Sequence, residues 1–386
     1  MYALPLCDIA RRKKNVIYER YAILRTNIEL DSTMLKDTKV SLLKELDTVR
    51  SKCKVSPKPR TFLEMVSATF RFLLFTITML GICLVLCTFS PLRWTHPFLR
   101  RFASVRNGDL PMDLLFRFSA RAALAAAGIK ATRLHSTRPR VGSSWGEHQY
   151  GIIVANHCSN LDPMVLTLAS PHIPKYVGKR SLFLIPIFGW ALLAIGFVPI
   201  NRGNRAKAIE ALNSAVHRIM LRFGRSVGLF VEGTRCRDGN LILPFKKGAF
   251  HMQRQTKAPL LPAVLDGTYE LWPSSHFFCR TGRVVVRIMP PLRYDASSSV
   301  NDTRLKLQRI MINEIYRKKD NLEIVPLNWS DVLENILILA SFFMILALVL
   351  GGWACVVSYS GFCTQSILSG AVCFSCVVTG YIYFVM

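Results

Sequence analysis

Two long stretches without a charged residue constrain the fold of this chain most. Residues 72–92 form a run of 21 residues, and residues 335–386 form a run of 52 residues. A helix needs about 20 apolar residues to cross the roughly 30 Å hydrocarbon core of a bilayer. The sequence therefore predicts an integral, multi-pass membrane protein. We expect one N-terminal membrane segment (66–92) and two C-terminal transmembrane helices (335–357 and 364–386).

The charge distribution favours a partner at the membrane. The formal net charge of the 386 residues is +26, and residues 93–334 alone hold 35 Lys and Arg against 16 Asp and Glu. Beside three apolar segments this excess suits anionic lipid headgroups and anionic substrates rather than nucleic acid, although a signal of membrane topology explains it equally well. The eleven cysteines lack the paired spacings of a disulfide framework, which favours a reducing compartment for the middle segment.

The remaining sequence divides into three parts. Residues 1–60 are polar and mixed in charge and are interpreted as an N-terminal extension. Residues 93–135 alternate arginines with apolar residues, which predicts amphipathic helices that lie in the membrane interface or pack on the next domain. Both flanks of the first apolar run are basic, so a single span and a re-entrant segment both remain open. Residues 136–330 form the predicted soluble domain.

This domain has the pattern of an α/β fold, with a mostly parallel sheet flanked by helices. Short apolar strands are predicted at 151–155, 196–200, 227–231 and 260–265, with 284–288 as a fifth, and a helix at 205–223. The first four strands each end in polar residues. Because open α/β sheets bind ligands at the carboxyl ends of their strands, we expect these clusters to share one crevice.

The first cluster contains a histidine in a strand-to-helix turn. The sequence V-A-N-H-C-S-N-L-D occupies 154–162, and Asp162 before Pro163 predicts a helix start with the carboxylate at the N-cap. On a regular helix His157 and Asp162 would be about 140° apart, so their contact requires the turn. There the carboxylate would orient the imidazole and leave its other nitrogen free to take a proton. A capped turn without chemistry is the structural alternative.

The other clusters suit a phosphate. Their candidate residues are Arg202, Glu232, Gly233, Thr234 and Arg235, followed by Lys246 and Lys247. The two arginines offer planar forks of donors, the threonine a hydroxyl, and the glycine lets backbone N–H groups approach an anion. The glutamate would hold the forks or accept a hydroxyl from the ligand. A buried ion pair between the glutamate and an arginine is the structural alternative.

A histidine base beside a phosphate clamp indicates that a hydroxyl is deprotonated and attacks an activated acyl group. The sequence has no G-x-S-x-G elbow, no P-loop and no H-E-x-x-H zinc motif, so neither a metal nor a cofactor is expected. A covalent role for Cys158 is an alternative, as in a thiol hydrolase. Adjacent residues on an extended turn point apart, which disfavours a Cys158–His157 pair.

Four ordered blocks resemble the glycerolipid acyltransferases. They are N-H-x4-D at 156–162, the segment 196–202, F-V-E-G-T-R at 230–235 with L-P-F-K-K-G-A-F at 243–250, and L-P-A-V at 261–264. The third block is most similar to 1-acyl-glycerol-3-phosphate acyltransferases. The resemblance implies the glycerolipid acyltransferase fold and, with acyl-CoA as co-substrate, transfer of an acyl chain to the sn-2 hydroxyl of lysophosphatidate to give phosphatidate.

The resemblance also implies residue roles. His157 would be the general base with Asp162 as its partner. The phosphate-binding residues would be Arg202, Glu232, Gly233, Thr234 and Arg235. Pro262 falls in the block associated with acyl-CoA. Lys246 and Lys247 are candidates for an acyl-CoA or accessory role. Val231 stands where the family has proline, and Pro199 and Asn201 vary the second block.

These departures leave the acceptor open. Lysophosphatidylcholine, lysophosphatidylethanolamine and glycerol 3-phosphate are alternatives, and a non-catalytic membrane scaffold that binds lipid or acyl-CoA is an alternative of another class. We expect the protein in the membrane of the endoplasmic reticulum, with the catalytic domain facing the cytosol.

Overall fold

The structure is a computed structural model. It describes residues 61–95, 111–135, 150–171, 173–201, 203, 205–222, 225–236, 245–274, 276–317 and 326–360. The predicted extension (1–60) and the second predicted C-terminal segment (364–386) lie outside the described residues.

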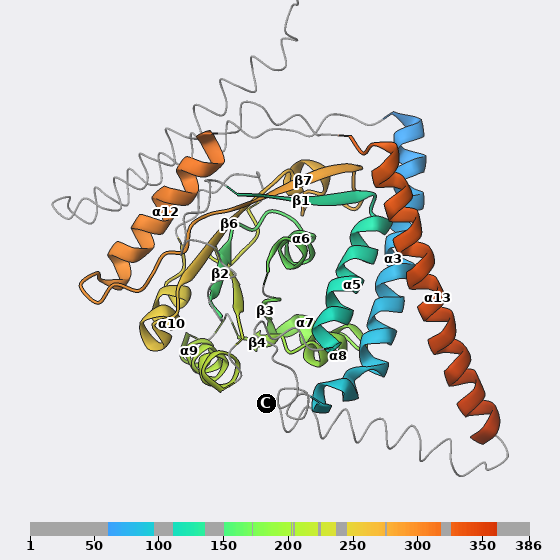
Figure 1. Cartoon of the computed structure of the whole chain (residues 1–386), viewed down its shortest axis with the longest axis horizontal. Coiled ribbons are helices and arrows are strands. Elements are labelled where there is room, and N and C mark those ends of the chain that lie inside the picture. Colours follow the sequence, from blue (N-terminus) through green and yellow to red (C-terminus); the bar gives the residue numbers. More distant parts are fainter. Residues whose placement is uncertain are drawn as a thin grey trace, which may run out of the picture.

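A seven-stranded, mostly parallel sheet forms the centre of the fold (Figure 1). Its strands are β1 (Ile129–His135), β2 (Ile152–Ala155), β3 (Lys175–Lys179), β4 (Val198–Ile200), β5 (Val227–Phe230), β6 (Leu260–Asp266) and β7 (Gly282–Ile288). They lie in the order β1-β7-β6-β2-β5-β3-β4, and only β6 and β7 pair antiparallel. The α/β prediction is confirmed, and all five predicted strands are present. Strands β1 and β3 are additional.

Helices cover both faces of this sheet. They are α3 (Phe62–Thr88), η1 (Ser90–Thr95), α5 (Pro111–Ala126), α6 (Asp162–Ala169), α7 (Arg180–Phe183), α8 (Phe188–Ala194), α9 (Arg205–Ala215), the π-helix η3 (Val216–Arg222), α10 (Gly248–Thr256), α11 (Thr268–Leu271), α12 (Val300–Arg317) and α13 (Trp329–Ser360). Strand β2 shows the two layers, because alternate side chains point to opposite faces. Ile153 and Ala155 join the core beneath α3, α5, α6 and α8, whereas Ile152 and Val154 join the core beneath α10 and α12.

Residues 111–135 differ from the prediction of interfacial helices. Strand β1 pairs with β7 in register from Ile129 to His135, so the sheet begins before residue 136. Helix α5 packs against α3, α6 and α13, and most of its side chains are buried, including Met112, Phe116 and Leu124. The described part of this segment therefore packs on the domain, which is the alternative expectation for these residues. Residues 96–110 lie outside the described part.

A buried ion cluster fixes α5 to the sheet. Asp113, in the first turn of α5, accepts hydrogen bonds from Lys175 at the start of β3 and, at 2.7 Å, from Arg225 just before β5. Lys175 also donates to the carbonyl oxygen of Ile195 at 2.7 Å. Burial of a charged lysine requires such partners, because desolvation of an unpaired charge is costly.

The two long apolar helices lie side by side (Figure 1). Gly81 of α3 lets Phe342 and Leu346 of α13 approach closely, and Trp353 of α13 donates to Thr88 of α3 at 3.2 Å. Among the described residues, α3 and α13 are the two helices whose length and composition allow them to cross a membrane. They correspond to the predicted segments 66–92 and 335–357.

Polar contacts fix the start of α13 to the sheet. Asp331 is buried and pairs with Lys130 of β1 at 2.9 Å and with Arg283 of β7 at 2.5 Å. Lys130 also contacts Glu334 at 2.6 Å. Helix α13 is therefore part of the helical layer on one face of the sheet.

Candidate active site

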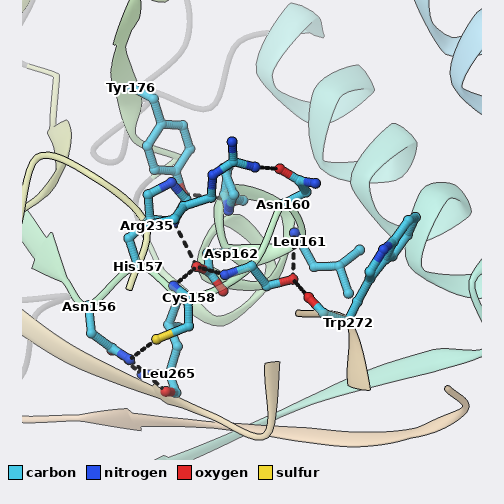
Figure 2. Close-up of polar contacts among 12 residues, drawn as sticks. Asn156, His157, Cys158, Asn160, Leu161, Asp162, Tyr176, Arg235, Leu265 and Trp272 are labelled. Carbon is cyan, nitrogen blue, oxygen red and sulfur yellow. Dashed lines mark hydrogen bonds and ion pairs between the residues drawn. The ribbon is translucent and has the colours of Figure 1, made fainter. Parts of the chain in front are cut away.

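The turn after β2 brings His157 and Asp162 together (Figure 2). Oδ2 of Asp162 lies 2.7 Å from Nδ1 of His157 and accepts the backbone N–H groups of Cys158 at 2.6 Å and Ser159 at 2.8 Å. Helix α6 begins at Asp162 itself, so the residue is not the N-cap that the sequence predicts, and Leu161 takes that position without a side-chain cap. The carboxylate instead folds back over the turn.

Neighbouring segments hold this turn in place. The side-chain amide of Asn156 donates to the carbonyl oxygen of Leu265 at 2.9 Å and accepts its N–H at 2.8 Å. Ser159 donates to the carbonyl oxygen of Trp272 at 2.7 Å, and the N–H of Cys236 donates to the carbonyl oxygen of His157 at 2.6 Å. These hydrogen bonds connect the residues on both sides of the histidine to β6 and to the segments that follow β5 and β6.

The histidine ring is oriented on two sides. Nδ1 faces the fully buried Asp162, and the ring stacks on Phe230 with centroids 4.1 Å apart and planes 16° apart. Phe230 in turn stacks on Tyr176, whose hydroxyl donates to the carbonyl oxygen of Pro163 at 2.9 Å. The imidazole remains 17 % exposed. With Nδ1 donating to the carboxylate, Nε2 is the ring nitrogen that is available to accept a proton.

The loop after β5 approaches the same turn. Arg235 and Thr234 are exposed, and Nη1 of Arg235 donates to Oδ1 of Asn160 in the histidine turn (Figure 2). Gly233 has φ of +69°, which favours glycine, and a Cβ there would lie 3.0 Å from Cγ of Lys246. The structure thus joins the first and third predicted clusters through a direct side-chain contact.

Glu232 differs from its neighbours because it is buried, with 1 % of its surface exposed. It lies near enough to Cys158 for its charge to act on that thiol. Its position beneath the surface suits support of the loop better than direct contact with a ligand.

The other predicted residues are spread around this centre. Lys246 is exposed and its N–H donates to the carbonyl oxygen of Val231 at 2.7 Å; Lys247 is exposed at the start of α10. Pro262 is buried in β6 opposite Val154, inside the sheet rather than at its edge. Arg202 lies outside the described residues. Strand β4, which precedes it, is separated from β5 by β3.

Cys158 is poorly suited to act as a nucleophile. Its side chain is buried, with 2 % of its surface exposed. Burial above all, and then the charge of Glu232, raises the pKa of the Cys158 thiol well above its ordinary value. A thiol in this position holds its proton at neutral pH, whereas attack requires the thiolate.

Sequence reasoning missed two residues of the site, Phe230 as the stacking partner of His157 and Asn160 as the acceptor for Arg235. Phe230 is part of the quoted third block and Asn160 of the first. No spacing rule relates residues on different strands or loops, so only the fold reveals their contacts.

Part of this chain is similar to known proteins. Residues 136–266 match the family model described as Acyltransferase. A 1-acyl-sn-glycerol-3-phosphate acyltransferase of Limnanthes douglasii is 34 % identical over 144 residues, covering 37 % of this chain and 50 % of that protein. The enzyme of the same name from Saccharomyces cerevisiae is 35 % identical over 142 residues, covering 36 % and 46 %. The chain thus spans about half the length of these curated relatives.

The crystal structure of the 1-acyl-sn-glycerophosphate acyltransferase PlsC from Thermotoga maritima is 21 % identical, with a TM-score of 0.49, and covers 67 % of this chain and 99 % of that chain. The family match covers the segment that carries the histidine turn and the β5 loop. Residues 136–266 therefore form an acyltransferase domain.

Proposed function

We propose that the chain transfers a fatty acyl group from acyl-CoA to the sn-2 hydroxyl of 1-acyl-glycerol-3-phosphate and so produces phosphatidate for phospholipid biosynthesis. The contact between His157 and Asp162 carries this proposal, since it leaves Nε2 as the free ring nitrogen beside an exposed arginine. The acyltransferase domain and the names of its relatives support the choice of reaction and acceptor.

The chemistry follows from the orientation of the imidazole. Nε2 of His157 takes the proton of the acceptor hydroxyl as its oxygen attacks the thioester carbonyl carbon of acyl-CoA. The new C–O bond gives a tetrahedral intermediate, whose collapse breaks the C–S bond. The CoA thiolate leaves and receives the proton from Nε2. Asp162 keeps the ring in the required tautomer and stabilises its positive charge while the proton is held.

The phosphate of the acceptor is assigned to the β5 loop. Arg235 and Thr234 are exposed beside the histidine turn, and Gly233 opens the backbone to an anion. Arg202, after β4, and the support of Glu232 complete the proposed set. Lys246 and Lys247 add positive charge at the rim for the phosphates of acyl-CoA, with Pro262 shaping β6 beneath.

The cellular setting belongs to the same proposal. The enzyme needs no cofactor beyond its acyl-CoA co-substrate, and it acts as a membrane protein because long-chain lipids leave a bilayer with difficulty. The two apolar helices support membrane association. We place the protein in the endoplasmic reticulum with the catalytic domain on the cytosolic side.

The test uses purified full-length protein, labelled acyl-CoA and a panel of acceptors. Lysophosphatidate is expected to be the preferred acceptor over lysophosphatidylcholine, lysophosphatidylethanolamine and glycerol 3-phosphate. His157→Gln should lower kcat by about a hundredfold to ten-thousandfold, the usual contribution of a general base. His251→Gln, at an exposed position on α10, is the matched control and should retain the wild-type rate.

Two results would overturn parts of this proposal. Near-normal transfer by His157→Gln would remove the catalytic assignment of this residue, whereas absence of transfer by the wild type to every acceptor would support a binding scaffold. A preference for a choline or ethanolamine acceptor would retain the chemistry and refute the acceptor.

A further inference from the structure

The segment that follows β3, residues 179–186, exposes an unusual amount of apolar surface. Leu182, Leu184 and Ile185 are 41 %, 68 % and 46 % exposed, and all three lie within four residues. Scattered exposed leucines are ordinary, but a contiguous group on one short segment marks an interaction surface. We name residues 179–186 the lip.

The lip has a fixed shape, so these side chains cannot turn inward. Phe183 in its middle is 7 % exposed and anchors it to the core. A Cβ at Gly189 would lie 2.2 Å from the carbonyl oxygen of Phe183, and one at Gly178 would lie 3.1 Å from its ring. Ile187 adopts φ of +63°, which is strained for a β-branched residue and is retained where the surroundings impose it.

The lip lies between the candidate active site and α3. On one side, β3 contributes Tyr176, which stacks on Phe230 beneath His157. The carboxyl end of β3 also lies at the same edge of the sheet as that of β2, because β3, β5 and β2 are parallel neighbours. On the other side, Sγ of Cys87 at the end of α3 contacts the carbonyl oxygen of Ile187 at 3.7 Å. Figure 1 shows α7 and α8 beside that end of α3.

The chemistry of the lip fits an anionic lipid surface. Lys179 and Arg180 are exposed directly before the aliphatic group. Apolar tips next to cations suit a bilayer, where the aliphatic chains enter the acyl layer and the cations meet the phosphates. Helix α3, whose end contacts Ile187, also exposes the aliphatic side chains of Leu80 and Leu84. A bilayer accounts for exposed aliphatic side chains both on the lip and on the candidate membrane helix beside it.

We propose that the lip inserts into the bilayer and opens the active site toward membrane-held lipid, so that the acceptor reaches His157 without leaving the membrane. The substrate part of this proposal rests on the proposed function. The contact between lip and lipid does not, because it can be measured without catalysis.

Photo-crosslinking of the full chain in vesicles tests the contact. The vesicles contain phosphatidylcholine, an anionic phospholipid and a phospholipid with a diazirine in its acyl chain. After irradiation, mass spectrometry should find lipid adducts on the peptide that spans the lip. The double variant Leu184→Ser/Ile185→Ser should lose them. Ile310→Ser, an exposed position on α12 at the opposite side of the fold, should retain them.

Kinetics provide the second readout. With vesicle-held acceptor the double variant should show a KM raised by about tenfold or more, because two buried aliphatic side chains are lost from the bilayer. With a short-chain acceptor dispersed below its micellar concentration, its kcat and KM should equal those of Ile310→Ser. Both proteins should have the melting temperature of the wild type.

The outcomes separate the two proposals. Adducts confined to α3 and α13, or equal KM values for the double variant and Ile310→Ser on vesicles, would overturn the lip and leave the transferase intact. Adducts on the lip in a protein that transfers no acyl group to any acceptor would support the membrane contact and reject the proposed function.

Discussion

At the scale of single residues, the carboxylate of Asp162 has two tasks. One of its oxygens meets the ring of His157 and two backbone N–H groups of the turn. A carboxylate forms stronger, shorter hydrogen bonds to such donors than a neutral acceptor does. The same charge therefore shapes the turn and orients the histidine, so catalysis and local stability depend on one atom.

This double task predicts how Asp162→Asn differs from His157→Gln. The amide keeps the shape but loses the charge, so kcat should fall by about a hundredfold or more, because it no longer stabilises the protonated ring. Its melting temperature should also fall, because the turn loses charge-assisted hydrogen bonds. His157→Gln should lose activity with a smaller fall in melting temperature, because the two backbone hydrogen bonds to Asp162 remain. Initial rates and thermal unfolding measure both, and equal melting temperatures for the two variants would contradict the shared role.

Stacking on Phe230 gives a second prediction. An aromatic pair contributes about 0.5 to 1.5 kcal/mol beyond its buried area. Phe230→Leu keeps an apolar residue but frees one face of the His157 ring, so kcat should fall by about threefold to tenfold with KM unchanged. Phe197→Leu is the matched control, because the ring of Phe197 meets that of Tyr176 edge-on, with centroids 5.1 Å apart, and Phe230 rather than Phe197 stacks on the histidine. An equal loss of kcat in both variants would show general loosening of the core instead.

The guanidinium of Arg235 gives a third prediction. Lysine keeps the charge but loses the fork and the contact with Asn160. The KM for lysophosphatidate should rise by about tenfold to a hundredfold in Arg235→Lys, the usual effect of losing one charge-assisted hydrogen bond. Arg254→Lys, exposed on α10, should leave KM unchanged. An unchanged KM in Arg235→Lys would place the phosphate elsewhere.

At the scale of elements, the sequence predicts the strands that form short apolar runs and misses β1 and β3, in which lysine, arginine or histidine interrupts the apolar pattern. Strands β2, β5 and β6 lie inside the sheet and are short apolar runs. Strand β1 is an edge strand with the pattern I-K-A-T-R-L-H, which no alternation rule recognises. Strand β3 begins with a lysine whose burial requires distant partners, above all Asp113, 62 residues earlier. Long-range ion pairs of this kind leave no local signal in sequence.

The same limit applies to the site. The pairing of His157 with Asp162 follows from local spacing and the helix start, so it is predictable. The contact between Arg235 and Asn160 spans 75 residues and depends on β2 and β5 being neighbours. The assignment of residues 93–135 to the interface fails for α5 because Asp113 and its apolar face pack inward.

The Asp113 cluster gives a prediction about stability. Asp113→Ala leaves Lys175 and Arg225 buried without their carboxylate, so the free energy of unfolding should fall by about 3 to 5 kcal/mol. Adding Lys175→Met should restore part of the lost free energy of unfolding, because it removes one of the two positive charges that Asp113→Ala leaves without a carboxylate. Glu210→Ala, at an exposed position on α9, is the control and should be near neutral. Urea unfolding in detergent measures all three, and a double variant less stable than Asp113→Ala would refute the explanation.

At the scale of the whole molecule, α13 packs both on the acyltransferase domain and on α3, the other candidate membrane helix. Its first turn is fixed to β1 and β7 by Asp331, and its middle crosses α3 at Gly81. The apolar faces of α3 and α13 that remain exposed, together with the lip, then keep a fixed relation to His157. Attachment of α13 therefore matters to where a membrane would lie relative to the site.

The ion pairs at the start of α13 predict a specific dependence on pH. Hydrogen bonds to Asp331 and then to Glu334 raise the pKa of Lys130 above its ordinary value of 10.5. A group whose pKa is raised by folding stabilises the protein fully below its unfolded pKa and loses that contribution as the pH rises through the folded pKa. The difference in melting temperature between the wild type and Lys130→Met should therefore stay constant from about pH 6 to 9 and shrink only above about pH 10.5. Lys257→Met, at the exposed end of α10, should show no such difference. A difference that disappears already between pH 6 and 9 would mean that Lys130 does not bind α13 to the sheet in solution.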